Sequence, residues 1–272
     1  MISFSTLIGI TAGVGLFVAA VITSTDNYMM FVSVASGMMV VGSTFAASLI
    51  SFSFMEVSHA IKAMFQTILA GNTSQGHLSD LVKRFMELSN IYRDGGITAL
   101  EDCQTKAEKK DPLMALGIEL MGSGYKQGDI RVIMGDAMDS HWQRQSLEGK
   151  ILNTMGVYAP GFGMVGTIVG LIIMLDNMGG DMANLGKGLA LALITTLYGV
   201  LLANLLFKPT AAQVTEKQEQ EYFRHELITD GFVMLAEKKD SLLIQDRLNA
   251  YIKPSKRYQP ADAGDWYVFG FT

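Results

Sequence analysis

Charge is what this 272-residue sequence lacks over its longest stretches. Asp, Glu, Lys and Arg make up 17% of the chain, yet four segments contain none of them: residues 1–25, 27–55, 151–175 and 188–207. A helix needs roughly 20 apolar residues to cross ~30 Å of hydrocarbon, and each segment is long enough. We therefore predict an integral membrane protein with four transmembrane helices, at about residues 3–22, 30–54, 152–175 and 186–207.

The charge-free segments that make up the predicted spans also contain no carboxylate and no histidine that could carry an ion. Proton and cation carriers generally keep a carboxylate or a histidine at membrane depth, although an Asp at mid-helix costs roughly 2.5–3.5 kcal/mol on insertion scales. If this chain handles an ion gradient, the titrating carboxylate must come from another polypeptide. The sequence therefore predicts an obligate partner.

Residues typical of catalytic and metal sites are scarce. The single cysteine, Cys103, excludes an intrachain disulfide, and the four histidines stand far apart in no metal-binding motif. The net charge of −5, with no basic stripe interleaved with aromatics, excludes the usual nucleic-acid binding pattern. We expect no enzyme activity, no cofactor and no metal site.

The charges that are present predict the orientation in the membrane. Residues 55–150 carry eleven Lys or Arg and the segment after Phe207 carries nine, whereas the two short turns between spans carry only Lys187. Lys and Arg concentrate in cytoplasmic segments. We expect the middle block, the tail and both termini to be cytoplasmic.

Helical spacing of apolar residues predicts that the charged segments are also helical, so the fold class is all-α. One helix starts near Leu78 and stops at Gly95–Gly96, a second follows Pro112, and a third starts near Asp129 and continues into the third span. The predicted organisation is two transmembrane helices, a cytoplasmic helical domain, two further transmembrane helices, cytoplasmic C-terminal helices and a loosely ordered tail, at residues 1–54, 55–150, 151–207, 208–253 and 254–272.

Small residues and hydroxyls crowd the third and fourth spans. Gly163, Gly166 and Gly170 share one helix face, and small residues of this kind let membrane helices approach closely. Pro160 removes a backbone hydrogen bond and predicts a kink. In the fourth span, Thr195 lies on a hydroxyl-bearing face. This face either lines a polar path or forms a packing seam.

Three motifs resemble the MotA/PomA stator subunits of the bacterial flagellar motor, within the MotA/TolQ/ExbB superfamily. They are YAPGFGMVGTIVGLIIMLDNM and LALALITTLYGVLLANLLFKP in the third and fourth spans and YRDGGITALED in the cytoplasmic block. The resemblance covers roughly residues 1–253 and agrees with the topology derived from charge. It implies a stator subunit of the bacterial inner membrane that converts ion flux into torque.

The resemblance also implies an assembly and a set of partners. Such subunits form a pentameric, homo-oligomeric ring around the single transmembrane helices of two MotB/PomB-type, peptidoglycan-binding subunits, whose aspartate binds the travelling H+ or Na+. The cytoplasmic domain of the ring then acts on a protein of the rotor switch complex. Membrane lipid surrounds the spans.

Individual residues take roles by their match to the family motifs. Pro160 matches a proline associated with coupling, and the hydroxyls along the ion path match Thr167, Thr195 and Thr196. The charged residues that engage the rotor match Arg93, Glu101 and, more weakly, Asp102. Asp94 departs from the family pattern because some sodium-driven members have Lys there. Without the resemblance, Arg93 and Glu101 would be read as a solvated pair at a helix end.

Two other functions stay open at this point. The chain could be an ExbB/TolQ-type energiser of outer-membrane transport or a phage-defence motor, although the ExbB/TolQ group usually has three spans. It could also be a membrane scaffold without ion coupling. The coupling ion is open too: hydroxyl oxygens favour sodium slightly, but proton-driven members carry the same threonine motifs.

Overall fold

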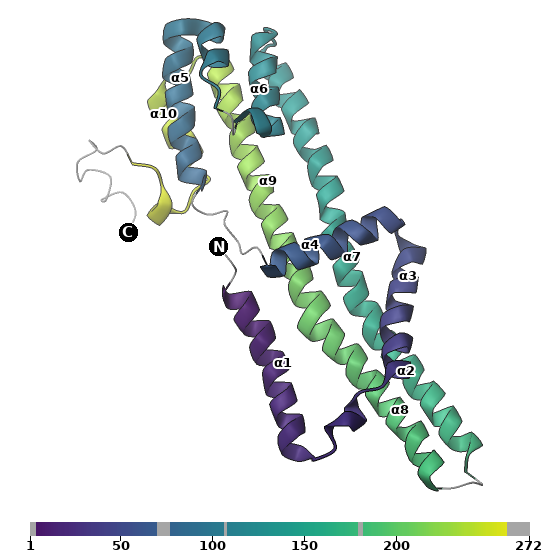
Figure 1. Cartoon of the computed structure of the whole chain (residues 1–272). Helices are drawn as coiled ribbons and strands as arrows, with labels where there is room; N and C mark the ends of the chain where they lie inside the picture. The colour runs from purple at the N-terminus through teal and green to yellow at the C-terminus, as the bar shows by residue number, and fades with distance from the viewer. Residues whose placement is uncertain (1–3, 70–76, 106–107, 179–181, 260–272) are drawn as a thin grey trace. The chain divides into compact units, whose positions relative to one another are not determined.

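The computed structural model describes residues 4–69, 77–105, 108–178 and 182–259, which form helices and turns and no strand (Figure 1). The chain divides into two compact units. The first unit comprises Met1–Asn72 and Gln145–Gln218, and the second unit comprises Thr73–Arg144 and Glu219–Thr272. Each unit is therefore assembled from two segments that are distant in the sequence.

The first unit contains the apolar helices. These are α1 (Phe4–Ser24), α2 (Val34–Gly37), a π-helical turn (Met38–Gly42), α3 (Ser43–Ser51), α4 (Phe54–Leu69), the later part of α7 (Gln127–Asp176), α8 (Met182–Leu201), a second π-helical turn (Leu202–Phe207) and the start of α9 (Lys208–Ala236). A single 3-10 turn, Tyr28–Phe31, lies between α1 and α2. Helix α2 contacts α8, and α1 contacts α4 and the second π-helical turn.

Three helical stretches of the described chain are long and apolar enough to cross a membrane. They are Tyr28–Ser51 and parts of Gln127–Asp176 and Leu185–Ala236, which cover the second, third and fourth predicted spans. The second span ends at Ser51, a little before the predicted boundary, because Phe52 is extended. Helix α1 is a 21-residue helix without charge at the place of the first predicted span. The total of four spans stays a prediction.

The second unit contains the charged helices predicted from the sequence. These are α5 (His77–Asp102), a 3-10 turn (Glu108–Lys110), α6 (Pro112–Gly122), the early part of α7, the later part of α9, α10 (Ser241–Asn249) and a 3-10 turn (Pro254–Lys256). The expected stop at Gly95–Gly96 is confirmed as a break inside α5, since Gly96 has φ +69°. The helices after Pro112 and from about residue 129 into the third span are also confirmed.

Two aromatic rings sit at the centre of the second unit, each against a glycine. Phe85 and Phe232 meet edge to face with ring centroids 5.3 Å apart, and both side chains are fully buried. A Cβ on Gly231 would lie 2.6 Å from the Phe85 ring, and a Cβ on Gly117 would clash with the Phe232 ring. Gly117 therefore lets α6 approach the Phe232 ring on α9, and Gly231 lets α9 approach the Phe85 ring on α5.

The predicted loose tail begins with ordered structure. Pro254–Lys256 form the last 3-10 turn. Tyr258 then donates its backbone N–H to Asn249 Oδ1 at 3.0 Å and accepts from Asn249 Nδ2 at 2.9 Å. The remainder of the predicted tail, from residue 260, lies outside the described residues.

Candidate functional site

A seam of small residues joins α7 to α8 in the first unit. The backbones approach so closely that a Cβ on Gly170 would lie 2.5 Å from the Ala192 nitrogen, and a Cβ on Gly199 would lie 2.6 Å from the Ala159 carbonyl oxygen. Gly163 faces the Thr195–Thr196 backbone in the same seam. The shared face of Gly163, Gly166 and Gly170 is therefore confirmed as a packing face.

Thr167 and Thr196 meet across this seam. Their hydroxyls are hydrogen-bonded to each other. The Thr167 hydroxyl also lies 3.1 Å from the Gly163 carbonyl oxygen and 3.2 Å from that of Ala192, and the Thr196 hydroxyl lies 3.4 Å from both. Four oxygen atoms from two helices thus gather at one point.

This oxygen cluster is neutral and half-buried. A hydroxyl has one proton to donate and two lone pairs to accept with, so only one of the two threonines donates to the other. Lone pairs therefore remain, and hard cations are bound by oxygen ligands of this kind. Because no carboxylate lies beside the cluster in the described helices, a charge that balances a cation would have to come from elsewhere.

Thr195 occupies a different environment from the other two threonines. Its side chain is fully buried, and its hydroxyl donates within α8, 2.9 Å from the carbonyl oxygens of Leu191 and Ala192. Its Cβ would lie 2.5 Å from a Cβ on Gly166. The structure therefore brings Thr167 and Thr196 together and places Thr195 against a glycine of the seam.

Pro160 lies within α7, next to the seam residue Ala159. Helix α7 runs unbroken through Pro160, from Gln127 to Asp176. A proline has no N–H, so the carbonyl of Gly156 loses its usual partner in the helix. A Cβ on Gly156 would lie 2.9 Å from the Lys208 side chain, so α7 and α9 are close together at this turn.

Tyr198 ties the start of the second span to α8. Its hydroxyl donates to the Phe31 carbonyl oxygen at 2.7 Å and accepts from the Ser33 N–H at 3.1 Å. Ser33 is in turn the N-cap of α2, where its side chain accepts from the Ser36 N–H. One phenol therefore satisfies two backbone groups that precede a membrane helix, which is valuable where water is scarce.

The residues predicted to contact a rotor lie on both sides of the Gly96 break in α5. Arg93 precedes the break and forms an exposed ion pair with Asp240 at 3.0 Å, with side chains 57% and 56% exposed. Glu101 and Asp102 follow the break and are exposed. The Glu101 carboxylate lies over α6, because a Cβ on Gly122 would be 2.6 Å from its Oε1. Arg93 bonds Asp240 and Asn90 rather than Glu101.

Sequence reasoning missed two partly buried ion pairs that hold the second unit together. Arg84 bonds Glu108 at 2.6 Å and the Cys103 carbonyl oxygen at 2.8 Å. Arg224 pairs with Asp111, whose carboxylate also caps α6 by accepting from the Leu113 and Met114 N–H groups. The Asp-Pro pair at residues 111–112 is a typical helix start and could have identified the cap, although not its arginine.

These pairs shift the pKa values of their carboxyl groups. Burial by itself would raise the pKa of Asp111, but the hydrogen bond and the charge of Arg224, together with the two capping N–H groups, lower it below its ordinary value. Glu108 follows the same logic, because the bonds from Arg84 and Thr105 outweigh burial and lower its pKa. Both carboxylates are therefore stabilised in their charged form.

Comparison with protein families gives a match over the middle of the chain. A model of the MotA/TolQ/ExbB proton channel family matches residues 105–226. That segment includes the seam and the oxygen cluster.

Several curated proteins are similar over most of the chain. YtxD, an uncharacterised protein of Bacillus subtilis, is 32% identical over 247 residues, which cover 90% of this chain and 89% of that protein. The chemotaxis protein PomA of Vibrio alginolyticus is 29% identical over 253 residues, covering 93% and 96%. Motility protein A of Aquifex aeolicus is 32% identical over 216 residues, covering 79% and 83%.

Two solved structures share the fold. The MotAB structure of C. jejuni matches with a TM-score of 0.77 at 18% identity, and the flagellar MotAB stator complex of Bacillus subtilis matches with a TM-score of 0.77 at 23% identity. Each match covers 92% of this chain and 96% of the matched chain. The similarity therefore extends over both units.

Proposed function

Because the chain belongs to the MotA/TolQ/ExbB proton channel family, we infer that it is a membrane protein that acts as a stator subunit of the bacterial flagellar motor. The observation that carries this inference is the similarity to the chemotaxis protein PomA over 96% of its length and to motility protein A of Aquifex aeolicus over 83% of its length. The inferred activity is conversion of an ion flux into torque on the rotor.

In this proposal the ion passes beside the closely packed seam between α7 and α8, past the half-buried hydroxyls of Thr167 and Thr196. Thr167 and Thr196 offer the ion oxygen atoms from two helices, and Thr195 is the third hydroxyl of the path, held against Gly166. The described helices supply no carboxylate here. A MotB/PomB-type partner with one membrane helix would provide the ion-binding aspartate, which agrees with the partner named in the MotAB structures that share this fold.

The proposed coupling and rotor contact use the remaining candidate residues. Pro160 would let α7 change its bend, because the helix lacks one backbone hydrogen bond at that turn. Arg93, Glu101 and Asp102 would face the rotor switch complex, since all three are exposed. We further propose a pentameric ring in the bacterial inner membrane with both termini in the cytoplasm.

Deletion and complementation test the function. Loss of the chain should abolish swimming while leaving flagellar filaments intact, and the wild-type gene should restore it. The Thr196→Val variant should insert and assemble normally but fail to restore swimming, because it removes one oxygen of the cluster. Thr154→Val is the matched control, since the Thr154 hydroxyl donates to the Lys150 carbonyl oxygen within its own helix. Undiminished swimming after deletion would favour another ion-driven output of the same family.

Charge reversal tests the rotor contact separately from the ion path. Arg93→Glu should impair torque more than Arg93→Ala. An exposed ion pair contributes about 0–1 kcal/mol, so neither change should lower the unfolding temperature much. Glu101→Lys should behave likewise. Unchanged swimming in both charge-reversal variants and in their combination would refute the contact while leaving the ion path standing.

Measurements of swimming speed identify the coupling ion. We propose Na+ ahead of H+, because two hydroxyls and two carbonyls form the cluster and these are typical ligands of hard cations. Swimming that depends on external sodium and persists with a protonophore would support sodium. Loss of swimming with the protonophore at constant sodium would assign the proton.

A further inference from the structure

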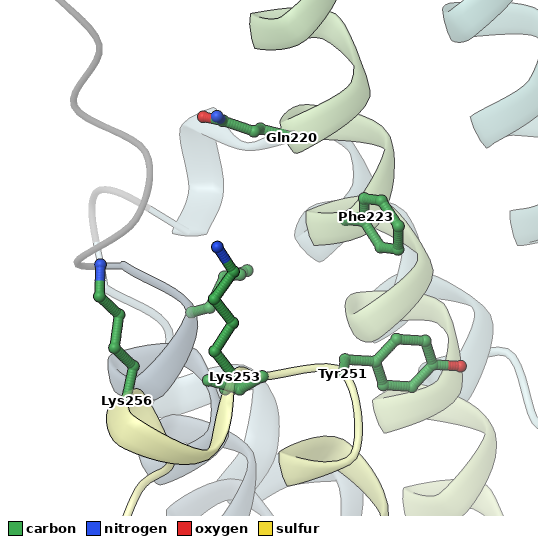
Figure 2. A pocket seen from close by; sticks show the side chains of 7 residues that line it. Gln220, Phe223, Tyr251, Lys253 and Lys256 are labelled. Atoms are coloured by element: carbon green, nitrogen blue, oxygen red, sulfur yellow. The ribbon is translucent and has the colours of Figure 1, made fainter.

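A small apolar pocket in the second unit is not used by the proposed function. It has a volume of about 240 Å³ and lies between the start of α5, the middle of α9 and the segment after α10 (Figure 2). Its lining residues are Leu78, Gln220, Phe223, Tyr251, Ile252, Lys253 and Lys256. Pockets for drug-sized ligands measure roughly 300–1,000 Å³, so this one suits a single aromatic side chain better than a cofactor.

Hydrogen bonds and packing hold the residues that line the pocket in place, although the pocket itself is open to solvent. The Tyr251 hydroxyl donates to Asp230 Oδ2 at 2.7 Å, and Arg131 pairs with the same carboxylate at 3.0 Å. Ile252 is buried in the core of the second unit. Phe223, by contrast, is 54% exposed, so a large apolar surface remains for an occupant to cover.

Positive charge borders the pocket. Lys253 and Lys256 line it, and Figure 2 shows their amino groups pointing in the same direction along one side. Arg257 follows directly and donates to the Ile252 carbonyl oxygen. An occupant that combines an aromatic ring with a neighbouring carboxylate would match both the apolar floor and this charged edge.

The chain itself contains such a segment a few residues further on. Residues 260–272 carry two aspartates, no lysine or arginine, and the apolar run Trp266-Tyr267-Val268-Phe269. Asp265 directly precedes Trp266, so one dipeptide offers the carboxylate and the ring together.

The number of residues between Tyr258 and Trp266 is large enough for Trp266 to reach the pocket. Tyr258 is held to α10 by its two hydrogen bonds with Asn249, and the pocket residue Lys256 lies two positions earlier, within roughly 7 Å. Trp266 lies eight positions later and can reach roughly 26–29 Å from Tyr258. Because the segment is covalently attached, its effective concentration at the pocket is on the order of millimolar, which favours it over separate ligands.

We propose that the pocket is the docking site of the chain's own C-terminal segment. The indole of Trp266 fills the space beside Phe223 and Tyr251, and Asp265, assisted by Asp262, lies next to Lys253 and Lys256. This contact is independent of ion conduction and goes beyond the stator function.

Fluorescence of Trp266 tests the proposal in the purified full-length chain. The only other tryptophan, Trp142, meets Tyr222 edge to face and is replaced by Phe, so that Trp266 is the only tryptophan that emits. In detergent, acrylamide should quench Trp266 several-fold less in this parent than after Phe223→Asp, which places a carboxylate in the pocket. Phe223 is half-exposed, so the unfolding temperature should hardly change.

Charge variants separate the electrostatic part. Lys253→Glu with Lys256→Glu should increase quenching by a smaller, salt-sensitive factor. Adding Asp262→Lys and Asp265→Lys should restore the shielding. Lys126→Glu, at an exposed lysine that does not line the pocket, should leave the quenching unchanged.

Two outcomes would overturn the proposal. Trp266 could be as accessible in the parent as in Phe223→Asp, which would mean that it does not dock. Alternatively, Trp266 could stay shielded in Phe223→Asp, which would assign it to another surface. Repeating that measurement in detergent over a range of protein concentrations would then distinguish a second copy of the chain, if the shielding falls on dilution, from another surface of the same chain, if it does not.

Discussion

The two units of this protein are held together by opposite kinds of residue. In the first unit, α7 and α8 meet through glycine, alanine and threonine, and their backbones touch. In the second unit, two phenylalanines fill the centre and partly buried ion pairs surround it. The same chain therefore uses small residues where its surroundings are lipid and large or charged ones where they are water.

The difference follows from the solvent. Lipid is as apolar as leucine, so burying leucine against leucine gains nothing in a membrane, and close packing with hydrogen bonds has to stabilise the contact. In water, burial of a side chain such as Phe contributes roughly 1.5–3 kcal/mol. Adding volume should therefore do most damage in the first unit, and removing a charge partner should do most damage in the second.

The largest effect is expected when volume is added to the seam. Gly170→Leu would drive a side chain into the backbone of α8 at Ala192 and Gly188, and overpacking of this kind costs about 3 kcal/mol or more. We expect loss of monodisperse protein on size-exclusion chromatography and loss of swimming. Gly161→Leu on the same helix meets no atom within 4 Å of its Cβ and should be tolerated. If both variants lost monodispersity and swimming to the same extent, close packing at the seam could not explain the loss.

The next effect is expected from breaking a charge pair in the second unit. Arg224→Gln leaves the Asp111 carboxylate, which is 13% exposed, without its cation, and we expect a loss of about 2–3 kcal/mol at neutral pH. Because Asp111 has a lowered pKa in the folded protein, the pair stabilises the fold above the unfolded pKa of roughly 3.9. That contribution is lost as the pH falls through the folded value.

Thermal unfolding against pH checks this sign. The wild type should exceed Arg224→Gln in unfolding temperature at neutral pH, and the gap should narrow once the pH falls well below roughly 4. Asp111→Asn should show a similar loss with a flatter pH dependence. A gap that is constant over the whole range would mean that Arg224 acts through packing alone.

A smaller effect is expected when volume is added beneath the aromatic rings. Gly231→Ala would bring a methyl group to 2.6 Å from the Phe85 ring, and the resulting shift should cost about 1–2 kcal/mol. Gly135→Ala is the control, since nothing lies within 4 Å of its Cβ. Replacing this helical glycine by alanine should raise the free energy of unfolding by about 0.5–1 kcal/mol. Unfolding temperatures of the two variants should therefore move in opposite directions.

The smallest effect is expected from removing one hydroxyl in the first unit. Tyr198→Phe keeps the ring but deprives the Phe31 carbonyl and the Ser33 N–H of their partner, at a cost of about 1 kcal/mol. Swimming should persist at low temperature and fail at a lower upper limit than in the wild type. A wild-type temperature profile would show that other groups, such as water, satisfy this backbone.

Much of the fold could be predicted because its signals are local. The break at Gly96, the helix start at Pro112 and the long helix that enters the third span each depend on neighbouring residues. Helix α4 was not predicted, although Val57, Ala60 and Met64 are buried at helical spacing on it. The candidate residues came from a family resemblance. The sequence alone could not tell Thr195 from its neighbour Thr196, although Thr195 is buried and Thr196 is half-buried.

By itself, the sequence determined that the chain has segments long and apolar enough to enter a membrane, because a charge in hydrocarbon is costly wherever it occurs and its absence can be counted along the chain. It also determined that the charge-free segments of this chain contain no carboxylate and no histidine. Only the tertiary structure decided that Thr167 meets Thr196 across 29 positions and that Arg224 meets Asp111 across 113. Such partners are chosen by the approach of two backbones, and that approach depends on every residue along both helices.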